Sequence, residues 1–132
     1  MNCKHAFLLV LVSTALVMSG CHKTDVKDYI PPDEPARKAL TAALDAWREG
    51  KALDQIGASN PKVEAQDIQW RDGKKLAAYE IVGPTTGDDQ NTRFKVKLTI
   101  AGAAPQETTY VVVGKDPIWV FSEESYKRAA GQ

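Results

Sequence analysis

The sequence has few of the residues that catalytic and metal sites most often use. Two of its 132 residues are cysteine and two are histidine, and none lies beyond position 22: Cys3, His5, Cys21 and His22. The rest of the chain therefore has no thiol for a disulfide, a cysteine nucleophile or a thiolate zinc site. It also has no imidazole, which excludes Ser-His-Asp and Cys-His catalysis and histidine-ligated metals. We expect no metal, no other cofactor and no enzymatic activity.

A net charge is absent as well. The chain has 17 basic and 17 acidic side chains, so its formal net charge is zero, and it shows no acidic or basic tail. Because binding to a phosphate backbone needs a basic excess, we do not expect nucleic acid as a partner. The length allows one domain, and a content of 43% hydrophobic and 26% charged residues is typical of a globular protein.

The sequence also lacks an apolar run long enough to span a membrane. Such a helix needs roughly 20 apolar residues, whereas the run at 6–17, AFLLVLVSTALV, is shorter and contains a serine and a threonine. Lys4 precedes this run, and the small residues Ser19 and Gly20 follow it. A positive start, an apolar middle and a small-residue end together predict a secretory signal peptide over residues 1–20.

The end of this segment, Met18-Ser19-Gly20-Cys21, resembles a bacterial lipobox, with methionine in place of the preferred leucine. The resemblance implies that the Cys21 thiol is linked to diacylglycerol, that the signal is cut before it, and that the new amine is acylated, for example with palmitate. Two or three acyl chains would anchor the chain in effect permanently. The alternative is an ordinary signal peptide cut near Gly20, which leaves Cys21 as a free or intermolecular thiol.

The lipobox resemblance also predicts a location. It implies export and lipid anchoring in a bacterial cell envelope. In the sorting rule of enterobacteria, an aspartate after the lipidated cysteine retains a lipoprotein at the inner membrane. His22 occupies that position here, so the resemblance favours the outer membrane, facing the periplasm.

Residues 21–35 are polar and contain the Pro31-Pro32 pair, which is typical of an extended tether. A single domain is expected over 36–129. It begins with the clearest helix, PARKALTAALDAWRE at 35–49, which Asp33 or Glu34 would cap and Gly50 would end. Apolar residues recur at helical spacing and form one stripe that we expect to face the core: Ala36, Leu40, Ala43, Leu44 and Trp47.

The period then changes to two, which predicts strands. Four strands are expected, at 63–70, 76–82, 93–100 and 107–113, with 118–121 as a continuation of the last one beyond a bulge. Asp72-Gly73 predicts a tight hairpin between the first two strands. In the third strand, Phe94 and the alternate residues after it would face the core, while Arg93 and its alternates would face water. Ser122 would cap a short helical piece at 123–129.

This order predicts an α+β fold with one N-terminal helix packed on a curled four-stranded antiparallel sheet. Over roughly residues 36–121, the element order resembles the cystatin-like superfamily, which includes the cone-shaped nuclear-transport-factor-2-like folds. In some cone-fold enzymes a buried acid acts as a general base. Glu80 would take that role if the row of Leu76, Ala78 and Val82 faced the core, because burial raises the pKa of a carboxyl group. The alternative places Tyr79 and Ile81 inward and Glu80 on the surface, beside Lys95 or Lys97.

The segment Asp116-Pro117-Ile118-Trp119 resembles the Pro-Trp loop with which cystatins enter protease clefts, although an isoleucine separates the pair and the companion Gln-x-Val-x-Gly hairpin is absent. The resemblance implies that Trp119 contacts a partner protein. This inhibitor hypothesis requires the Asp72-Gly73 turn at the same end of the sheet, and an exposed Trp119. The alternative is that Trp119 packs in the core, as Trp47 and Trp70 are expected to do.

Two further patterns do not point to a site. Ser59-Asn60-Pro61-Lys62 matches Ser-x-x-Lys, but the proline opposes the helix that the motif needs. Asp88-Asp89-Gln90-Asn91 offers oxygens to calcium, but it lacks the alternating spacing of an EF-hand loop. The chain is therefore expected to be a non-catalytic, lipid-anchored envelope protein that binds an envelope protein partner or has a structural role. The alternatives are a small-ligand-binding or enzymatic cone fold with Glu80 in its pocket, and a protease inhibitor of cystatin-like type.

Overall fold

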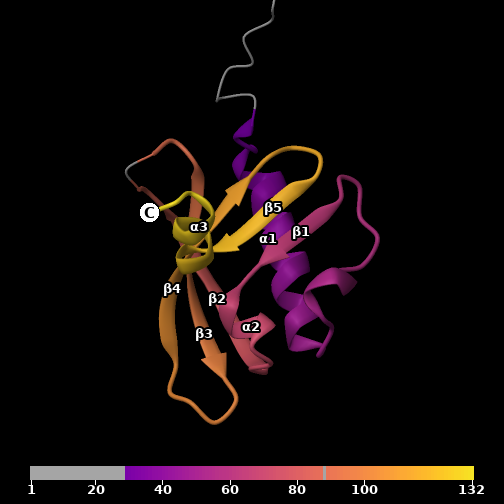
Figure 1. The fold of residues 1–132 in the computed structure, drawn as a ribbon, viewed down its shortest axis with the longest axis vertical. Helices are drawn as coiled ribbons and strands as arrows, with labels where there is room; N and C mark the ends of the chain where they lie inside the picture. The colour runs from indigo at the N-terminus through magenta and orange to yellow at the C-terminus, as the bar shows by residue number, and fades with distance from the viewer. Residues whose placement is uncertain (1–28, 88) are drawn as a thin grey trace, which may run out of the picture.

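One five-stranded sheet organises the part of the chain that the structure, a computed structural model, describes: residues 29–87 and 89–132. The chain order of its helices and strands is α1 (Asp33–Arg48), a 3₁₀ turn (Leu53–Gln55), β1 (Val63–Gln66), α2 (Ile68–Arg71), β2 (Leu76–Thr85), β3 (Thr92–Ile100), β4 (Gln106–Val113), β5 (Ile118–Ser122) and α3 (Glu123–Ala129). The strand order is β1-β5-β4-β3-β2 (Figure 1). None of the described helices is long and apolar enough to cross a membrane.

The two faces of the sheet are covered differently. α1 packs along one face over the buried residues of β3 and β4, and α3 packs on the opposite face against β4 and β5 (Figure 1). We call the face opposite α1 the outer face. Because side chains alternate along a strand, Phe94 lies under α1 while its neighbour Arg93 lies on the outer face, near α3.

The expected α+β class is confirmed, but the expected four-stranded antiparallel sheet is wrong. The segment 118–122 is a separate strand, which pairs antiparallel with β4 and parallel with β1. The chain reverses between β4 and β5 at Gly114, whose φ of 89° is accessible mainly to glycine. A parallel neighbour cannot be reached by a hairpin, so β1 and β5 pair across all the elements that lie between them in the chain.

The predicted first strand is also shorter than expected. β1 ends at Gln66, and the Asp67 side chain accepts hydrogen bonds from the backbone N–H groups of Gln69 at 2.9 Å and Trp70 at 3.3 Å. This cap starts the short helix α2. Asp72 and Gly73 follow the end of α2, where the Gly73 N–H donates to the Trp70 carbonyl, so they do not form the predicted hairpin.

The helix predictions are confirmed with small changes. α1 spans Asp33–Arg48 and follows Pro32, without a side-chain cap from Asp33 or Glu34. Gly50 follows its end with a φ of 79°. The C-terminal helix α3 begins at Glu123, and Ser122 caps it as predicted: the Ser122 hydroxyl oxygen accepts a hydrogen bond from the Ser125 N–H.

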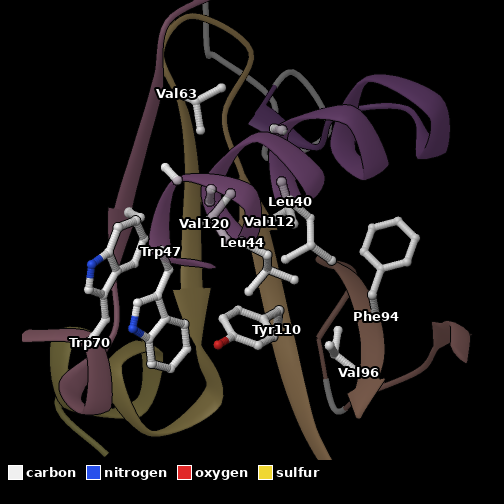
Figure 2. Close-up of a cluster of buried hydrophobic side chains, with 14 of the residues drawn as sticks. Leu40, Leu44, Trp47, Val63, Trp70, Phe94, Val96, Tyr110, Val112 and Val120 are labelled. Atoms are coloured by element: carbon white, nitrogen blue, oxygen red, sulfur yellow. The ribbon is translucent and has the colours of Figure 1, made fainter. Parts of the chain in front are cut away.

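The core lies between α1 and the sheet (Figure 2). Every member of the predicted α1 stripe is at most 2% exposed, and this stripe packs on buried residues of β3, β4 and β5: Phe94, Val96, Leu98, Tyr110, Val112 and Val120. At the C-terminal end of α1, the rings of Trp47 and Trp70 stack with centroids 5.7 Å apart. Their indole N–H groups donate to the carbonyls of Lys74 and Lys51, each at 2.7 Å, so neither ring buries an unpaired donor.

The chain enters this core at one end of the sheet. The Tyr29 carbonyl accepts a hydrogen bond from the Gly114 N–H at 2.6 Å, and the Pro31 carbonyl accepts one from the Thr92 hydroxyl at 2.9 Å. Pro31 itself is buried. The last part of the expected tether, from Tyr29 onward, therefore rests on the folded domain.

Candidate functional site

Cys21, the predicted lipidation site, lies outside the described residues. Glu80 lies on the outer face of β2, exposed to solvent and paired in register with Lys97 of β3. Tyr79 and Ile81 point the other way and pack against the core. Glu80 therefore lies on the surface, which is the alternative to the general-base hypothesis. That hypothesis requires a buried carboxyl group, and Glu80 is not buried.

Trp119 lies on the outer face of β5 and is partly exposed. Its ring stacks on Phe121, with centroids 5.8 Å apart, beside a hollow of about 450 Å³ that Val113 and Ser125 also line. The two loops of the inhibitor hypothesis lie at opposite ends of the sheet. Gly114 follows the end of β4 that pairs with Thr92, whereas Gly73 precedes the start of β2, which pairs with the other end of β3. The paired-loop arrangement is therefore absent.

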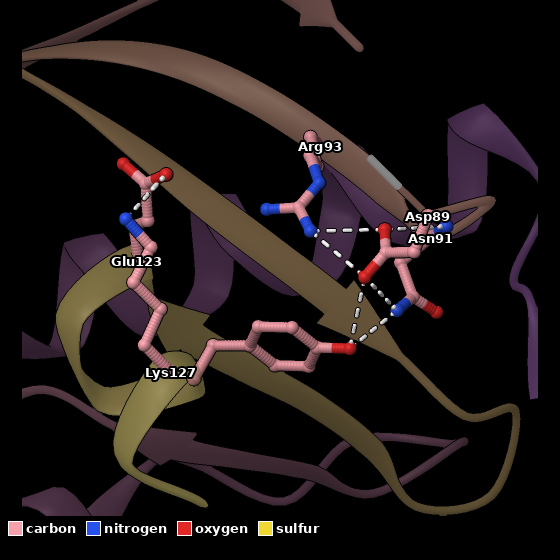
Figure 3. A network of polar contacts seen from close by, with 6 residues as sticks. Asp89, Asn91, Arg93, Glu123 and Lys127 are labelled. Carbon is pink, nitrogen blue, oxygen red and sulfur yellow. Dashed lines mark hydrogen bonds and ion pairs between the residues drawn. The ribbon is translucent and has the colours of Figure 1, made fainter. Parts of the chain in front are cut away.

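A polar network covers the outer face beside α3 (Figure 3). One guanidinium nitrogen of Arg93 donates to both carboxylate oxygens of Asp89, each at 2.9 Å, although the Arg93 side chain is only 10% exposed. Asn91 and the Tyr126 hydroxyl also donate to Asp89, at 3.0 and 3.1 Å. The guanidinium lies 5.4 Å from the centre of the Tyr126 ring, which is within the range of a cation–π contact.

This network ties the loop between β2 and β3 to the C-terminal helix. Gly87 passes so close to Arg93 that a Cβ atom there would clash with the guanidinium. Partial burial acts to raise the pKa of the Asp89 carboxyl group, but the hydrogen bonds from Arg93, Asn91 and Tyr126 outweigh it, so the pKa lies below its ordinary value. The arginine charge is thus neutralised locally, and we assign the network a structural role.

Replacing Asp89 with asparagine is expected to destabilise the fold by roughly 1–2 kcal/mol at pH 7. The figure is less than for a fully buried pair, because Asp89 is partly exposed and solvent screens its charge. Since the folded-state pKa of Asp89 is lowered, its contribution is present above the unfolded-state pKa of about 3.9. That contribution is lost as the pH falls through the folded-state pKa. Urea denaturation of both proteins at pH 7 and near pH 3 measures this difference.

The control for this prediction is Asp72→Asn. Asp72 is exposed and its contact with Arg71 is 3.9 Å long, so less than about 0.5 kcal/mol is expected. Equal losses for Asp72→Asn and Asp89→Asn at pH 7, or an Asp89 effect that is the same at both pH values, would contradict the prediction.

The described part of the chain has one buried carboxyl group, that of Asp67. Asp67 is 5% exposed, caps α2, and accepts a hydrogen bond of 2.5 Å from the Tyr110 hydroxyl. Burial raises the pKa of Asp67 above its ordinary value, although the hydrogen bonds from Tyr110 and the α2 backbone oppose this. Burial and the neighbouring carboxylate raise the pKa of Tyr110 well above its ordinary value. The pair is enclosed in the core, so it connects β4 to α2 and is not open to a substrate.

A concave site borders the first half of α1. We call it the α1 groove: a space of about 510 Å³ between the residues of α1 up to Ala42, the loop 59–61, and the first residues of β1 and β5, Val63 and Ile118. This volume is within the usual range for small-molecule sites. Ala39 and Ala42 line it with methyl groups only, and Glu34 and Lys38 lie at its rim.

Metal binding has no support within the described residues. No group of three or more His, Cys, Asp or Glu side chains in 29–87 and 89–132 could hold a metal ion. Asp88, part of the acidic run considered for calcium, lies outside that part. Ser59, Asn60 and Pro61 line the α1 groove and belong to no helix, so the Ser-x-x-Lys pattern does not place its lysine one helical turn from the serine.

Sequence reasoning missed the Asp67–Tyr110 pair and the burial of Arg93. Asp67 was hidden inside a predicted strand, although an aspartate before a short helix is a recognisable N-cap. Arg93 occupies the strand row that was expected to face water, and no local pattern predicts that α3 and the loop after β2 cover it.

Comparison of the chain with protein-family models, with curated proteins and with solved structures found no match. No function is therefore transferred to the chain from a relative.

Proposed function

We propose that this chain is an exported protein of a bacterial cell envelope, attached to a membrane through lipid on Cys21, and that its domain is a non-catalytic binding or structural module. The observation that carries the proposal is the sequence Met18-Ser19-Gly20-Cys21 at the end of an apolar run. The absence of histidine and cysteine beyond His22 supports the non-catalytic part.

The way the chain enters the domain is compatible with this attachment. Residues 22–28 separate Cys21 from Tyr29, which is hydrogen-bonded to Gly114. Seven residues span at most about 25 Å when fully extended. A lipid on Cys21 would therefore hold the Tyr29 end of the sheet close to the bilayer, and the outer face and the α1 groove would remain available to partners.

The test is Cys21→Ala. The variant is expected to lose incorporation of labelled palmitate and to move from the membrane fraction to the soluble fraction, because the thiol that carries the lipid is gone. Cys3→Ala is the matched control, since this cysteine lies in the signal peptide and its loss should change neither readout. Palmitate labelling that is absent from the wild type, or a Cys21→Ala protein that stays with membranes, would refute the anchor.

A further inference from the structure

The chain enters the domain at one end of the sheet, beside the turn that joins β4 to β5 (Figure 1). At that turn the Tyr29 carbonyl accepts a hydrogen bond from the Gly114 N–H. β3 starts at the same end, since Thr92 donates to the Pro31 carbonyl. The nine residues of β3 rise by about 3.3 Å each, so the turn after β3 lies roughly 30 Å away, at the opposite end of the sheet.

Two aromatic rings are exposed at this entry end, which we define as Tyr29, the turn 114–117 and Trp119. Tyr29 is 53% exposed. Trp119 is partly exposed and pairs in register with Val113, the residue before Gly114. Within residues 29–87 and 89–132 its indole N–H donates to no group, whereas the N–H groups of the two buried tryptophans donate to backbone carbonyls. Exposed tyrosine and tryptophan, with an apolar ring and a polar group, are the side chains that prefer the boundary between water and lipid.

The entry end has no excess of positive charge. In the turn, Lys115 and Asp116 are both exposed and have opposite signs. Asp33 and Glu34, in the first turn of α1, add negative charge on the other side of the sheet. Anionic lipids attract clusters of basic residues, and this end does not present one. A contact with lipid here would therefore depend on the two rings, which suits a bilayer of zwitterionic lipid.

The length of chain before Tyr29 limits how far this end can move from a bilayer, and this step rests on the proposed lipid at Cys21. The seven residues 22–28 span at most about 25 Å, which is less than the length of β3. The anchor therefore supplies a high effective concentration of lipid surface to the entry end. Two rings without basic charge need that supply, because they give a weak contact by themselves.

We propose that the entry end is a membrane-contacting surface, with the Tyr29 and Trp119 rings at the level of zwitterionic head groups. The Trp119 N–H donates to a phosphate or ester oxygen of the lipid, and the face of the ring displaces water from the lipid surface. The turn after β3 then points away from the membrane, and most of the outer face stays in water. Anchor and contact together fix the orientation of the domain, which a tether alone would leave free.

Quenching of tryptophan emission by lipids brominated near the head group tests this orientation. Cys3→Ala makes Cys21 the only thiol of the chain. The protein is held on vesicles of phosphatidylethanolamine and phosphatidylcholine through its own lipid. Where palmitate labelling shows that Cys21 has no lipid, its thiol is coupled to a maleimide phospholipid instead.

Partial quenching of the anchored protein is expected, up to the share of one indole in three. The quenching should be lost in Trp119→Phe. Trp47 and Trp70 should not contribute, because each is at most 7% exposed and they stack at the C-terminal end of α1, away from the entry end.

Two further variants move the reporter and serve as matched controls. In the Trp119→Phe protein, Lys115→Trp places an indole in the turn at the entry end and should restore quenching. Ala101→Trp places it in the turn after β3 and should not. Both positions are exposed, so neither change disturbs the core. Where Trp119→Phe does not fold, the same two substitutions are compared in the wild-type chain. Addition of phosphatidylglycerol should not increase the quenching.

Three results would overturn the proposal. The first is emission of the anchored wild type that brominated lipid does not quench. The second is equal quenching of Lys115→Trp and Ala101→Trp, which would mean that the domain has no preferred orientation. The third is quenching that requires phosphatidylglycerol, which would assign the contact to charge and not to the rings. Palmitate labelling reports on the anchor alone, and maleimide coupling tests the orientation without it, so the two proposals can fail separately.

Discussion

Trp47→Ala is expected to destabilise the protein by about 3–5 kcal/mol, the cost typical of removing a large aromatic ring from a core. Trp47 is 2% exposed, stacks on Trp70 and donates to the Lys74 carbonyl. Its removal leaves a cavity between α1 and α2 and deprives the carbonyl of its partner. Because small domains are stable by only about 5–15 kcal/mol, the urea midpoint should fall by a large part of its value.

Two variants separate the causes of this loss. Trp47→Phe keeps an aromatic ring in the stack but removes the N–H donor, so a smaller loss of roughly 1–3 kcal/mol is expected. Trp119→Ala serves as the control, because Trp119 is partly exposed on the outer face and does not belong to the core under α1. A loss for Trp119→Ala as large as that for Trp47→Ala would show that the α1 face is not the main core.

Asp67→Ala is expected to have the second largest effect, about 2–4 kcal/mol. The substitution removes the N-cap of α2, which is worth roughly 0.5–2 kcal/mol. It also leaves the buried Tyr110 hydroxyl without an acceptor, at a cost of roughly 1–3 kcal/mol. Denaturation of Asp67→Ala, Tyr110→Phe and the double variant measures the coupling, and the double variant should lose less than the sum of the two single losses. Strict additivity would mean that the hydrogen bond contributes nothing.

The Asp67–Tyr110 pair makes the stability of the fold depend on pH. This dependence is best measured against Asp67→Asn, because the asparagine side chain cannot titrate. Burial raises the folded-state pKa of Asp67 above its unfolded-state value. A raised pKa means that the folded state holds the proton more tightly, so the stabilisation is fully present below the unfolded-state pKa of about 3.9 and is lost as the pH rises through the folded-state pKa. The stability of the wild type relative to Asp67→Asn should therefore increase as the pH falls from 7 toward 4. A difference that stays constant over this range would contradict the raised pKa.

These two sites differ in how far sequence patterns revealed them. Trp47 belongs to an apolar stripe with helical spacing, and each position of that stripe is buried as predicted. The Asp67–Tyr110 pair joins residues 43 positions apart, and neither residue is unusual within its own segment. A pattern that repeats every few residues reports on local structure, whereas a contact between distant segments leaves no such repeat.

In the sheet, too, local patterns predicted some features correctly and missed those that depend on distant segments. The alternation in β3 correctly predicted which residues lie under α1, because one face of that strand packs on the helix. The partner of β1 was predicted wrongly, because Asp72-Gly73 resembles a hairpin turn when only the neighbouring residues are considered. In the folded protein the Asp67 cap starts a helix before that turn, and β1 is free to pair with β5.

The amino-acid sequence alone determined the helices α1 and α3, the alternation of the longer strands, the lack of histidine and thiol chemistry beyond residue 22, and the grounds for expecting a lipid anchor at Cys21. These features depend on residues close together in the chain, so local spacing is sufficient to reveal them. Only the tertiary structure decided that Glu80 is exposed, that Arg93 is buried beside Asp89, and that α1 and the starts of β1 and β5 enclose a groove. Each of these depends on which distant segments pack together, and that is determined by burial of the whole apolar surface and not by any single pattern.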